Sequence, residues 1–324
     1  MYPLRRFVFL ITLTLFANNG LSQTESWPNK PIKFVVTFPP GGSSDAAARI
    51  VAPRLAERLG QPVVVENRPG AGGGVGLDFV AKAPGDGYTI VLASAGGLTA
   101  NPSLYPRLGY DTLRDFAPIT LFGTSPFVLI ANPSLAVSNV GDVIKLAKAQ
   151  PGKLSYASGG NGTAMHLSGE LLKSMSQTRI LHIPYRGSSP ALLAVMAGET
   201  QLAVVDITTA ASQIKSGRVK ALGVLGKTRS SMAPELPTFN ETGLSGYDAS
   251  GWFGILAPAS TPVAITQRLN AEITAVLRSQ EVREKFANAW LEPLPSTQEE
   301  MALLLKTETV KWAKVIKDSG ATVD

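Results

Sequence analysis

The stretch Phe34-Val35-Val36-Thr37-Phe38-Pro39-Pro40-Gly41-Gly42-Ser43-Ser44-Asp45 decides how the fold begins. Its first five residues are apolar or β-branched, which predicts a buried strand. Two prolines and two glycines then end the strand and let the backbone pass close to a ligand. Ser43 or Ser44 can cap a helix over residues 45–59, whose apolar side chains recur every four residues. Such a helix start suits an anion, because it presents free N–H groups and a partial positive charge. An ordinary strand–turn–helix joint without a ligand explains the same residues.

The same order of features returns at residues 154–175. A strand-like run over residues 154–158 is followed by Gly159-Gly160-Asn161-Gly162, and Thr163 then stands where an N-cap is expected. The helix behind Thr163 carries apolar residues at every fourth position. The two glycine-rich helix starts lie about one domain's length apart in sequence. If they face each other across a cleft, they can hold two ends of one small anionic molecule.

The beginning of the chain has the layout of a secretory signal peptide. Arg5 and Arg6 precede an apolar run over residues 7–17, and Gly20-Leu21-Ser22 forms a small-residue cleavage site. The apolar run is about half the length that spans a bilayer. We therefore expect residues 1–22 to be removed on export to the periplasm. The chain of 324 residues has no cysteine, which excludes thiol catalysis and thiolate metal sites.

The chain carries a net charge of +6, without a basic block and without alternation of basic and aromatic residues. This distribution argues against a nucleic-acid partner and fits a small anionic ligand.

Strand-like runs alternate with amphipathic helical runs along almost the whole chain. Strands are predicted at residues 32–38, 63–66, 89–93, 127–131, 154–157, 180–183, 202–205 and 219–225. Helices are predicted at residues 45–59, 76–83, 140–149, 164–175, 190–197, 262–279, 281–289 and 297–318. This alternation predicts an α/β fold, rich in parallel strands, with helices on both faces of its sheets. The extended runs 119–131 and 250–257 have no crossover helix beside them, and we expect them to link two lobes.

Motifs typical of enzymes and cofactor sites are not found. The glycine-rich run over residues 68–76 does not fit the G-x-G-x-x-G frame, and no acid follows where a ribose needs one. There is no G-x-S-x-G nucleophile elbow, and His166 and His182 lack the spacing of a metal site. We therefore expect no catalytic residue, no metal and no cofactor. His182 is expected on or under a strand. His166 lies where it can donate to a carboxylate, or it is a helix-surface histidine.

Two further strand ends point towards the predicted cleft. After the strand over residues 180–183, Ser189 and Pro190 indicate a helix start with Ser189 as N-cap. The strand over residues 202–205 ends in Asp206. The carboxyl ends of strands are where α/β sheets bind ligands. Asp206 can hold an amino or hydroxyl group of a ligand, or it caps the next helix.

An ordered set of motifs covers nearly all of the chain after residue 22. In chain order they are Trp27-Pro-x-Lys-Pro-Ile32, Phe38-Pro-Pro-Gly-Gly-Ser-Ser-Asp45, Gln61-Pro-Val-Val-Val-Glu-Asn-Arg-Pro-Gly-Ala-Gly-Gly73, Pro84-Gly-Asp-Gly-Tyr88, Asn101-Pro-x-Leu-Tyr105, Tyr110-Asp111, Asp115-Phe-Ala-Pro-Ile119, Ser158-Gly-Gly-Asn-Gly-Thr163, His182-Ile-Pro-Tyr-Arg-Gly-Ser188, Trp252-Phe-Gly-x-Leu-Ala-Pro258 and Arg268-Leu-Asn270. Together they resemble the Bug-type periplasmic substrate-binding receptors of tripartite tricarboxylate transporters.

The resemblance implies a two-lobed periplasmic-binding-protein fold of the type II, Venus-flytrap kind, with two strand crossings. We expect lobe one to comprise residues 23–124 and 253–324, and lobe two residues 125–252. A protein of this kind captures a small organic carboxylate between its lobes and delivers it to the membrane permease subunits of the transporter. It is expected to act as a monomer. An exported carboxylate-sensing subunit is the alternative, and a hydrolase or lyase with His166 or Asp206 as base is a further one.

The resemblance also implies which residues hold the ligand. In the family, the loops that match residues 38–45 and 158–166 hold the carboxylate, partly through ordered waters. The expected contacts are Phe38, Gly42, Ser43, Ser44, Asp45, Ser94, Ser158, Gly162, Thr163, His166, Gly187 and Asp206. One departure concerns the wall after Asp206, where many members have Asn-Leu-Pro-Ser and this chain has Ile207-Thr208-Thr209-Ala210. That change leaves the identity of the ligand open.

Overall fold

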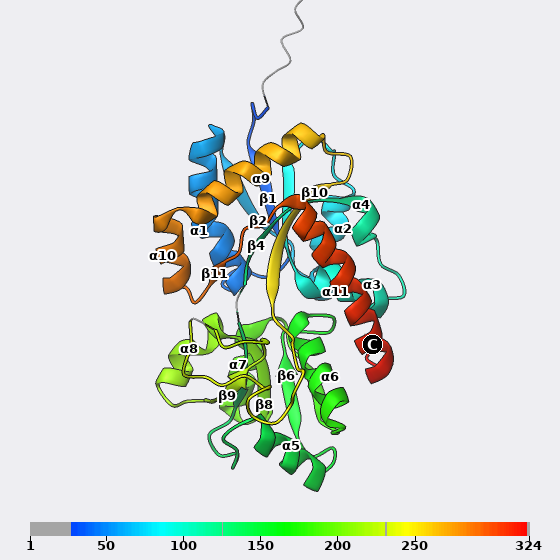
Figure 1. Cartoon of the computed structure of the whole chain (residues 1–324), viewed down its shortest axis with the longest axis vertical. Coiled ribbons are helices and arrows are strands. Elements are labelled where there is room, and N and C mark those ends of the chain that lie inside the picture. The colour runs from blue at the N-terminus through cyan, green and yellow to red at the C-terminus, as the bar shows by residue number, and fades with distance from the viewer. Residues whose placement is uncertain (1–26, 125, 231, 323–324) are drawn as a thin grey trace, which may run out of the picture.

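The computed structural model describes residues 27–124, 126–230 and 232–322, so the predicted signal peptide lies outside the described residues. The described chain forms two α/β units, one above the other along the long axis of the molecule (Figure 1). Each unit is built around one sheet. No helix among the described residues has the length and apolar character that crossing a membrane requires.

The first sheet has six strands in the order β11-β4-β10-β3-β1-β2. β1 pairs in parallel with β2 and β3, whereas β10 runs antiparallel between β3 and β4. The strands are β1 (Ile32–Val36), β2 (Val63–Asn67), β3 (Thr89–Ser94), β4 (Phe116–Thr124), β10 (Trp252–Pro258) and β11 (Glu292–Pro293). The helices of this unit include α1 (Ser43–Leu59), α2 (Gly74–Ala81), α4 (Thr112–Asp115), α9 (Val263–Arg278) and α10 (Gln280–Asn288).

The second sheet has five strands in the order β7-β6-β8-β5-β9. β6 pairs in parallel with β7 and β8, and β5 runs antiparallel between β8 and β9. The strands are β5 (Phe127–Ala131), β6 (Ser155–Ser158), β7 (Leu181–Pro184), β8 (Leu202–Asp206) and β9 (Lys220–Val224). The helices are α5 (Val140–Ala149), α6 (Ala164–Ser176), α7 (Ser188–Ala197) and α8 (Ile207–Lys215).

Both sheets follow one topology. In each, three strands that are consecutive in the chain lie in the order second, first, third, and an antiparallel strand pairs with the free side of the third. That antiparallel strand is the one by which the chain enters from the other unit, β10 in the first sheet and β5 in the second. The predicted two-lobed α/β fold with two crossings is therefore confirmed, and we call the units the first and the second lobe. Division of the chain at residues 124 and 252 stays a prediction.

The helix α11 (Gln298–Ser319) ties the two lobes together on one flank. It begins beside the first sheet and ends beside α6 of the second lobe (Figure 1). Its residues Met301 and Leu305 belong to an apolar cluster of the first lobe. Further along the same helix, Trp312 and Ile316 belong to the main apolar cluster of the second lobe. The π-helical turn η2 (Gly96–Ala100) and α3 (Asn101–Leu104) lie in the same seam.

The helix starts differ from the predicted ones at two of three places. Thr163 is the N-cap of α6 as predicted, since its hydroxyl oxygen accepts from the backbone N–H of His166 at 3.2 Å. α1 instead begins at Ser43 itself with Gly42 as N-cap, and α7 begins at Ser188 with Gly187 as N-cap. The predictions that Ser43 or Ser44 and Ser189 act as caps are therefore wrong. In both glycine–serine runs a glycine is the N-cap and the serines lie in the first turn; Gly42 is extended, whereas Gly187 has a φ of +111°.

Candidate functional site

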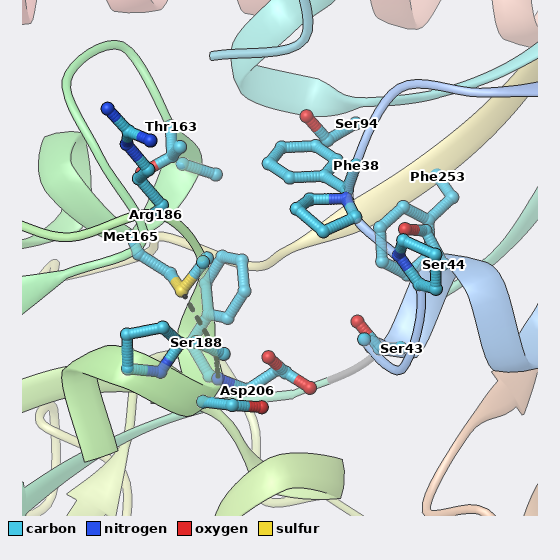
Figure 2. A pocket seen from close by; sticks show the side chains of 18 residues that line it. Phe38, Ser43, Ser44, Ser94, Thr163, Met165, Arg186, Ser188, Asp206 and Phe253 are labelled. Atoms are coloured by element: carbon cyan, nitrogen blue, oxygen red, sulfur yellow. Dashed lines mark hydrogen bonds between the residues drawn. The ribbon is translucent and has the colours of Figure 1, made fainter. Parts of the chain in front are cut away.

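A cavity of about 240 Å³ lies between the two lobes. Figure 2 shows residues of both lobes facing one another across it. The first lobe contributes Phe38, Pro39, Pro40, Gly42, Ser43, Ser44, Ser94 and Phe253. The second lobe contributes Phe127, Thr163, Ala164, Met165, Arg186, Gly187, Ser188, Ser189, Pro190 and Asp206.

Four helix N-termini converge on this cavity. Ser43 starts α1, Thr163 caps α6, Ser188 starts α7 and Asp206 is the N-cap of α8. These helices follow β1, β6, β7 and β8, whose carboxyl ends meet at the junction of the lobes. The first N–H groups of a helix have no intrahelical partner, and the helix dipole adds partial positive charge there. The four starts together make the cavity favourable for an anion.

The hydroxyl groups at these helix starts play different parts. Thr163 donates its hydroxyl proton to the carbonyl oxygen of Gly160 at 2.7 Å, so this side chain holds its own loop. The Ser44 side chain is buried, and none of the hydrogen bonds among the described residues uses its hydroxyl. Ser43 points from the first lobe towards Asp206 of the second (Figure 2). Ser44 is therefore better placed than Thr163 to donate a hydroxyl proton to a ligand, whereas the Ser43 hydroxyl is shared with Asp206.

Asp206 is a buried carboxyl group in the floor of the cavity. Burial raises its pKa above the usual value, although hydrogen bonds from the side chains of Ser188, Thr209 and Ser43 oppose the shift. Thr209 donates to Oδ1 at 3.2 Å, and the backbone N–H of Asp206 donates to the Ser188 hydroxyl at 3.1 Å. Asp206 therefore keeps its proton to a higher pH than an exposed aspartate does.

The rim of the cavity carries one arginine. Arg186 lines the cavity and also a second hollow of about 580 Å³ that shares Phe38 and Gly187 with it. Its side chain is exposed, and none of the ion pairs formed by the described residues includes it. The two hollows therefore adjoin, and Arg186 borders both of them.

The expected ligand contacts fall into two groups. Those that line the cavity are Phe38, Gly42, Ser43, Ser44, Ser94, Thr163, Gly187 and Asp206. Asp45, Ser158, Gly162 and His166 lie outside the lining. Asp45 accepts from Arg49 and Asn67, each at 3.0 Å, and from the backbone N–H of Gly41. Burial alone would raise its pKa, but these hydrogen bonds lower it, so Asp45 is an ionised residue that fixes the Gly41 turn.

Of the other three residues outside the lining, Gly162 belongs to the loop between β6 and α6, and Ser158 and His166 lie at its two ends. Ser158 is fully buried and lies with its hydroxyl oxygen 2.7 Å from Nε2 of His182. His166 is 3% exposed, so the reading of it as a helix-surface histidine is wrong. The backbone N–H of Gly162 donates to Nδ1 of His166 at 3.3 Å. Ser158 and His166 therefore support the loop, through their bonds to the backbone N–H groups of Gly160 and Gly162.

Several residues that line the cavity are not marked as ligand contacts by any motif in the sequence. Phe127 and Phe253 come from β5 and β10, the strands that cross between the lobes, and they form apolar walls. Met165 and Ser188 touch each other, with the Ser188 hydroxyl 3.3 Å from the Met165 sulfur. Arg186 belongs to a motif that was recognised, but its sequence position alone does not show that it reaches the cavity. The described residues contain no group of three or more histidines and acids arranged to hold a metal.

The fold and this site define the class of protein. Two α/β lobes joined by two crossings, with a cavity between them that is ringed by helix N-termini, form a two-lobed substrate-binding protein of the periplasmic type. The sequence model of the tripartite tricarboxylate transporter family receptors matches residues 47–321, and the chain belongs to this family.

Solved structures of similar sequence agree with this assignment. The periplasmic binding protein BugD is 34% identical, with a TM-score of 0.84 over 91% of this chain and 99% of BugD. R. palustris Rpa4515, solved with adipate, is 34% identical, with a TM-score of 0.86 over 91% of this chain and 99% of the other. MatC from Rhodopseudomonas palustris, solved with bound malate, is 29% identical, with a TM-score of 0.83 over 90% and 100% of the two chains. The resemblance to the Bug-type receptors is thereby confirmed.

Proposed function

We propose that this chain is an exported receptor that captures a small organic carboxylate between its lobes and delivers it to the permease of a tripartite tricarboxylate transporter. The convergence of four helix N-termini on one interlobe cavity is the observation that carries the proposal. Neutral donors suffice for such a site, because hydrogen bonds to an ionised acceptor are stronger than those between neutral groups.

The ligand that fits best has two carboxylates. One carboxylate takes the helix starts around Ser43 and Ser44, and the second lies towards Arg186 at the rim. Phe38, Phe127 and Phe253 supply apolar surface for a short methylene chain between the two charged ends. Adipate and malate in the two R. palustris structures are dicarboxylates of this kind and support the choice.

Binding without chemical conversion is the activity that the geometry favours. The Ser158 hydroxyl and the His182 imidazole lie 2.7 Å apart, as a nucleophile and a base would. Ser158 is, however, 0% exposed and lies outside the cavity lining, so a bound acid does not reach it. We infer that the receptor acts in the periplasm as a monomer, and that its lobes, residues 23–124 with 253–324 and residues 125–252, close on the ligand as a hinged clamp.

A thermal-shift screen with organic acids, followed by calorimetry, tests the proposal. An acid present at a hundred times its dissociation constant adds about 2.7 kcal/mol to the free energy of unfolding. The matched control for each diacid is its diamide, which has nearly the same shape and no charge. We expect adipate or another short diacid to stabilise the protein and its diamide to leave it unchanged. Equal effects of acid and amide, or no effect of any acid, would refute a carboxylate receptor.

The same samples distinguish binding from catalysis. Each stabilising acid is incubated with the protein overnight and then examined by proton NMR. A receptor leaves the acid unchanged, whereas a hydrolase or lyase produces new resonances. Turnover that disappears in a Ser158→Ala variant would replace our proposal with an enzymatic function.

A further inference from the structure

His166 supports the ligand-binding loop of the second lobe from behind. The side chain is 3% exposed and stacks on His182, with 4.1 Å between ring centroids and 21° between ring planes. Its Nδ1 accepts the backbone N–H of Gly162 at 3.3 Å. Its Nε2 lies 3.9 Å from Oε1 of Glu170. This geometry requires the neutral tautomer in which Nε2 carries the proton and Nδ1 is free to accept.

The loop that His166 contacts has an unusual backbone. Gly160 and Gly162 adopt φ values of +122° and +77°, which L side chains rarely adopt. Its turns are held by specific bonds: Gly160 N–H donates to the Ser158 hydroxyl at 3.1 Å, and Thr163 donates to the Gly160 carbonyl at 2.7 Å. The bond from Gly162 to Nδ1 joins this loop to the His166 side chain, in addition to the Thr163 cap, whose hydroxyl accepts the backbone N–H of His166 at 3.2 Å.

We propose that His166 is a positioning residue, which fixes the start of α6 in its ligand-binding geometry through the Gly162 N–H and does so only while its ring is neutral. Thr163, Ala164 and Met165 follow Gly162 directly and line the cavity. A change at Gly162 therefore moves the residues that face the ligand. The consequence for ligand affinity rests on the proposed function, whereas the effect on the loop does not.

Protonation reverses the role of Nδ1. A doubly protonated imidazole presents an N–H to Gly162, so that two donors face each other and the bond is lost. Burial lowers the pKa of His166 to about 4, with Glu170 opposing and Lys173 reinforcing the shift. The other ring of the stacked pair, His182 on β7, also has its pKa lowered by burial, to about 3. The neighbouring titratable groups are Tyr156 on β6 and Tyr247, and burial raises the pKa of both well above the usual value. The ring is thus neutral at pH 7 and becomes charged only in acid.

Two variants separate positioning from packing. In His166→Asn the side-chain amide oxygen takes nearly the place of Nδ1 and accepts from Gly162, but it does not titrate. In His166→Leu the volume is kept and the acceptor is lost. Hydrogen exchange of peptides covering residues 158–166 reads the loop directly in the full-length mature chain, without any ligand. Peptides that cover β8 (Leu202–Asp206) report on the global stability of the second lobe.

At pH 7 we expect the loop amides of His166→Leu to exchange about tenfold faster than those of the parent, while the exchange rates in β8 stay the same. The loop amides of His166→Asn should exchange at the rate of the parent. Protection is the ratio of the exchange rate of an unstructured peptide to that of the loop at the same pH. When the pH is lowered to about 3.5, the loop of the parent should lose protection and the loop of His166→Asn should keep it. Equal loop protection in the parent and in His166→Leu at pH 7 would overturn the proposal. So would a His166→Asn loop as open as that of His166→Leu.

Calorimetry with adipate at pH 7 forms the second arm. We expect His166→Leu to bind adipate about tenfold more weakly than His166→Asn. Equal affinities of the two variants would show that the loop order does not serve binding, and would limit His166 to a structural role. Failure of the parent itself to bind adipate or any other acid would count against the proposed function, while the exchange experiment would still decide the role of His166.

Discussion

Removal of the Ser44 hydroxyl is the most direct test of the carboxylate site. Ser44 is the second residue of α1, is 3% exposed and lines the cavity. Because its hydroxyl has no assigned partner among the described residues, Ser44→Ala removes a donor without breaking a known internal bond. A hydrogen bond to an ionised group contributes about 1.5–3 kcal/mol, which corresponds to roughly a ten- to hundredfold loss of affinity. Alanine favours the helix at least as well as serine, so folding should not suffer.

Isothermal titration with the acid that gives the largest thermal shift measures this loss, and the melting temperature of the ligand-free protein measures folding. Ser168→Ala is the matched control, because Ser168 is equally buried but donates to the Ala164 carbonyl inside α6 at 2.6 Å. We expect the control to bind like the parent. A Ser44→Ala protein that binds within about threefold of the parent would refute the assignment of the α1 start as a carboxylate site.

Three further outcomes follow from the structure. Arg186→Gln should weaken the binding of a diacid about five- to tenfold in calorimetry and leave the binding of the corresponding monoacid unchanged, since only the diacid has a second carboxylate for the rim. Equal losses of affinity for the two acids would show that Arg186 does not bind the second carboxylate. Asp206→Asn should bind a diacid at least as tightly as the parent at pH 7, because it removes a carboxyl group from beside an anion; a marked loss would instead indicate that Asp206 holds a cationic group. Because folding lowers the pKa of His166 to about 4, this residue binds more protons in the unfolded chain than in the folded one between about pH 6.5 and pH 4. Lowering the pH across that interval should therefore remove about 3 kcal/mol of stability through His166, and His182, whose pKa burial lowers to about 3, should add to the loss. Urea titrations at a series of pH values should show a smaller fall in the free energy of unfolding for His166→Asn than for the parent. The same dependence of this free energy on pH in both proteins would contradict the lowered pKa of His166.

The sequence was most informative where the signal was local. Thr163 was identified as an N-cap because a single threonine separates a glycine turn from an amphipathic helix, and it is the cap. In the runs Gly42-Ser43-Ser44 and Gly187-Ser188-Ser189, the general preference for serine as an N-cap led to the prediction of Ser43 or Ser44 in the first and of Ser189 in the second, and it gave no reason to choose the glycine. In both runs glycine takes the cap position, and the serines move into the first turn where they face the cavity.

Long-range relations account for what could not be predicted. Asp45 looked like a ligand contact from its place in the motif, but its carboxylate is used by Asn67, which comes from the next strand. Phe127 and Phe253 reach the cavity only because β5 and β10 cross between the sheets, and neither phenylalanine stands out from the apolar residues around it. Periodicity shows that a residue is buried, whereas the fold decides what it is buried against.

The position of α11 also determines when the second lobe can finish folding during synthesis. The second lobe is one continuous stretch of chain, yet Trp312 and Ile316, among the last described residues, belong to its main apolar cluster. Until those residues have left the ribosome, the face of α6 that α11 covers stays open to water. The newly made chain therefore has an uncovered face of α6 until Trp312 and Ile316 have been added. A C-terminal truncation before Trp312 should accordingly make the second lobe prone to aggregate, although every strand of both sheets would already be present.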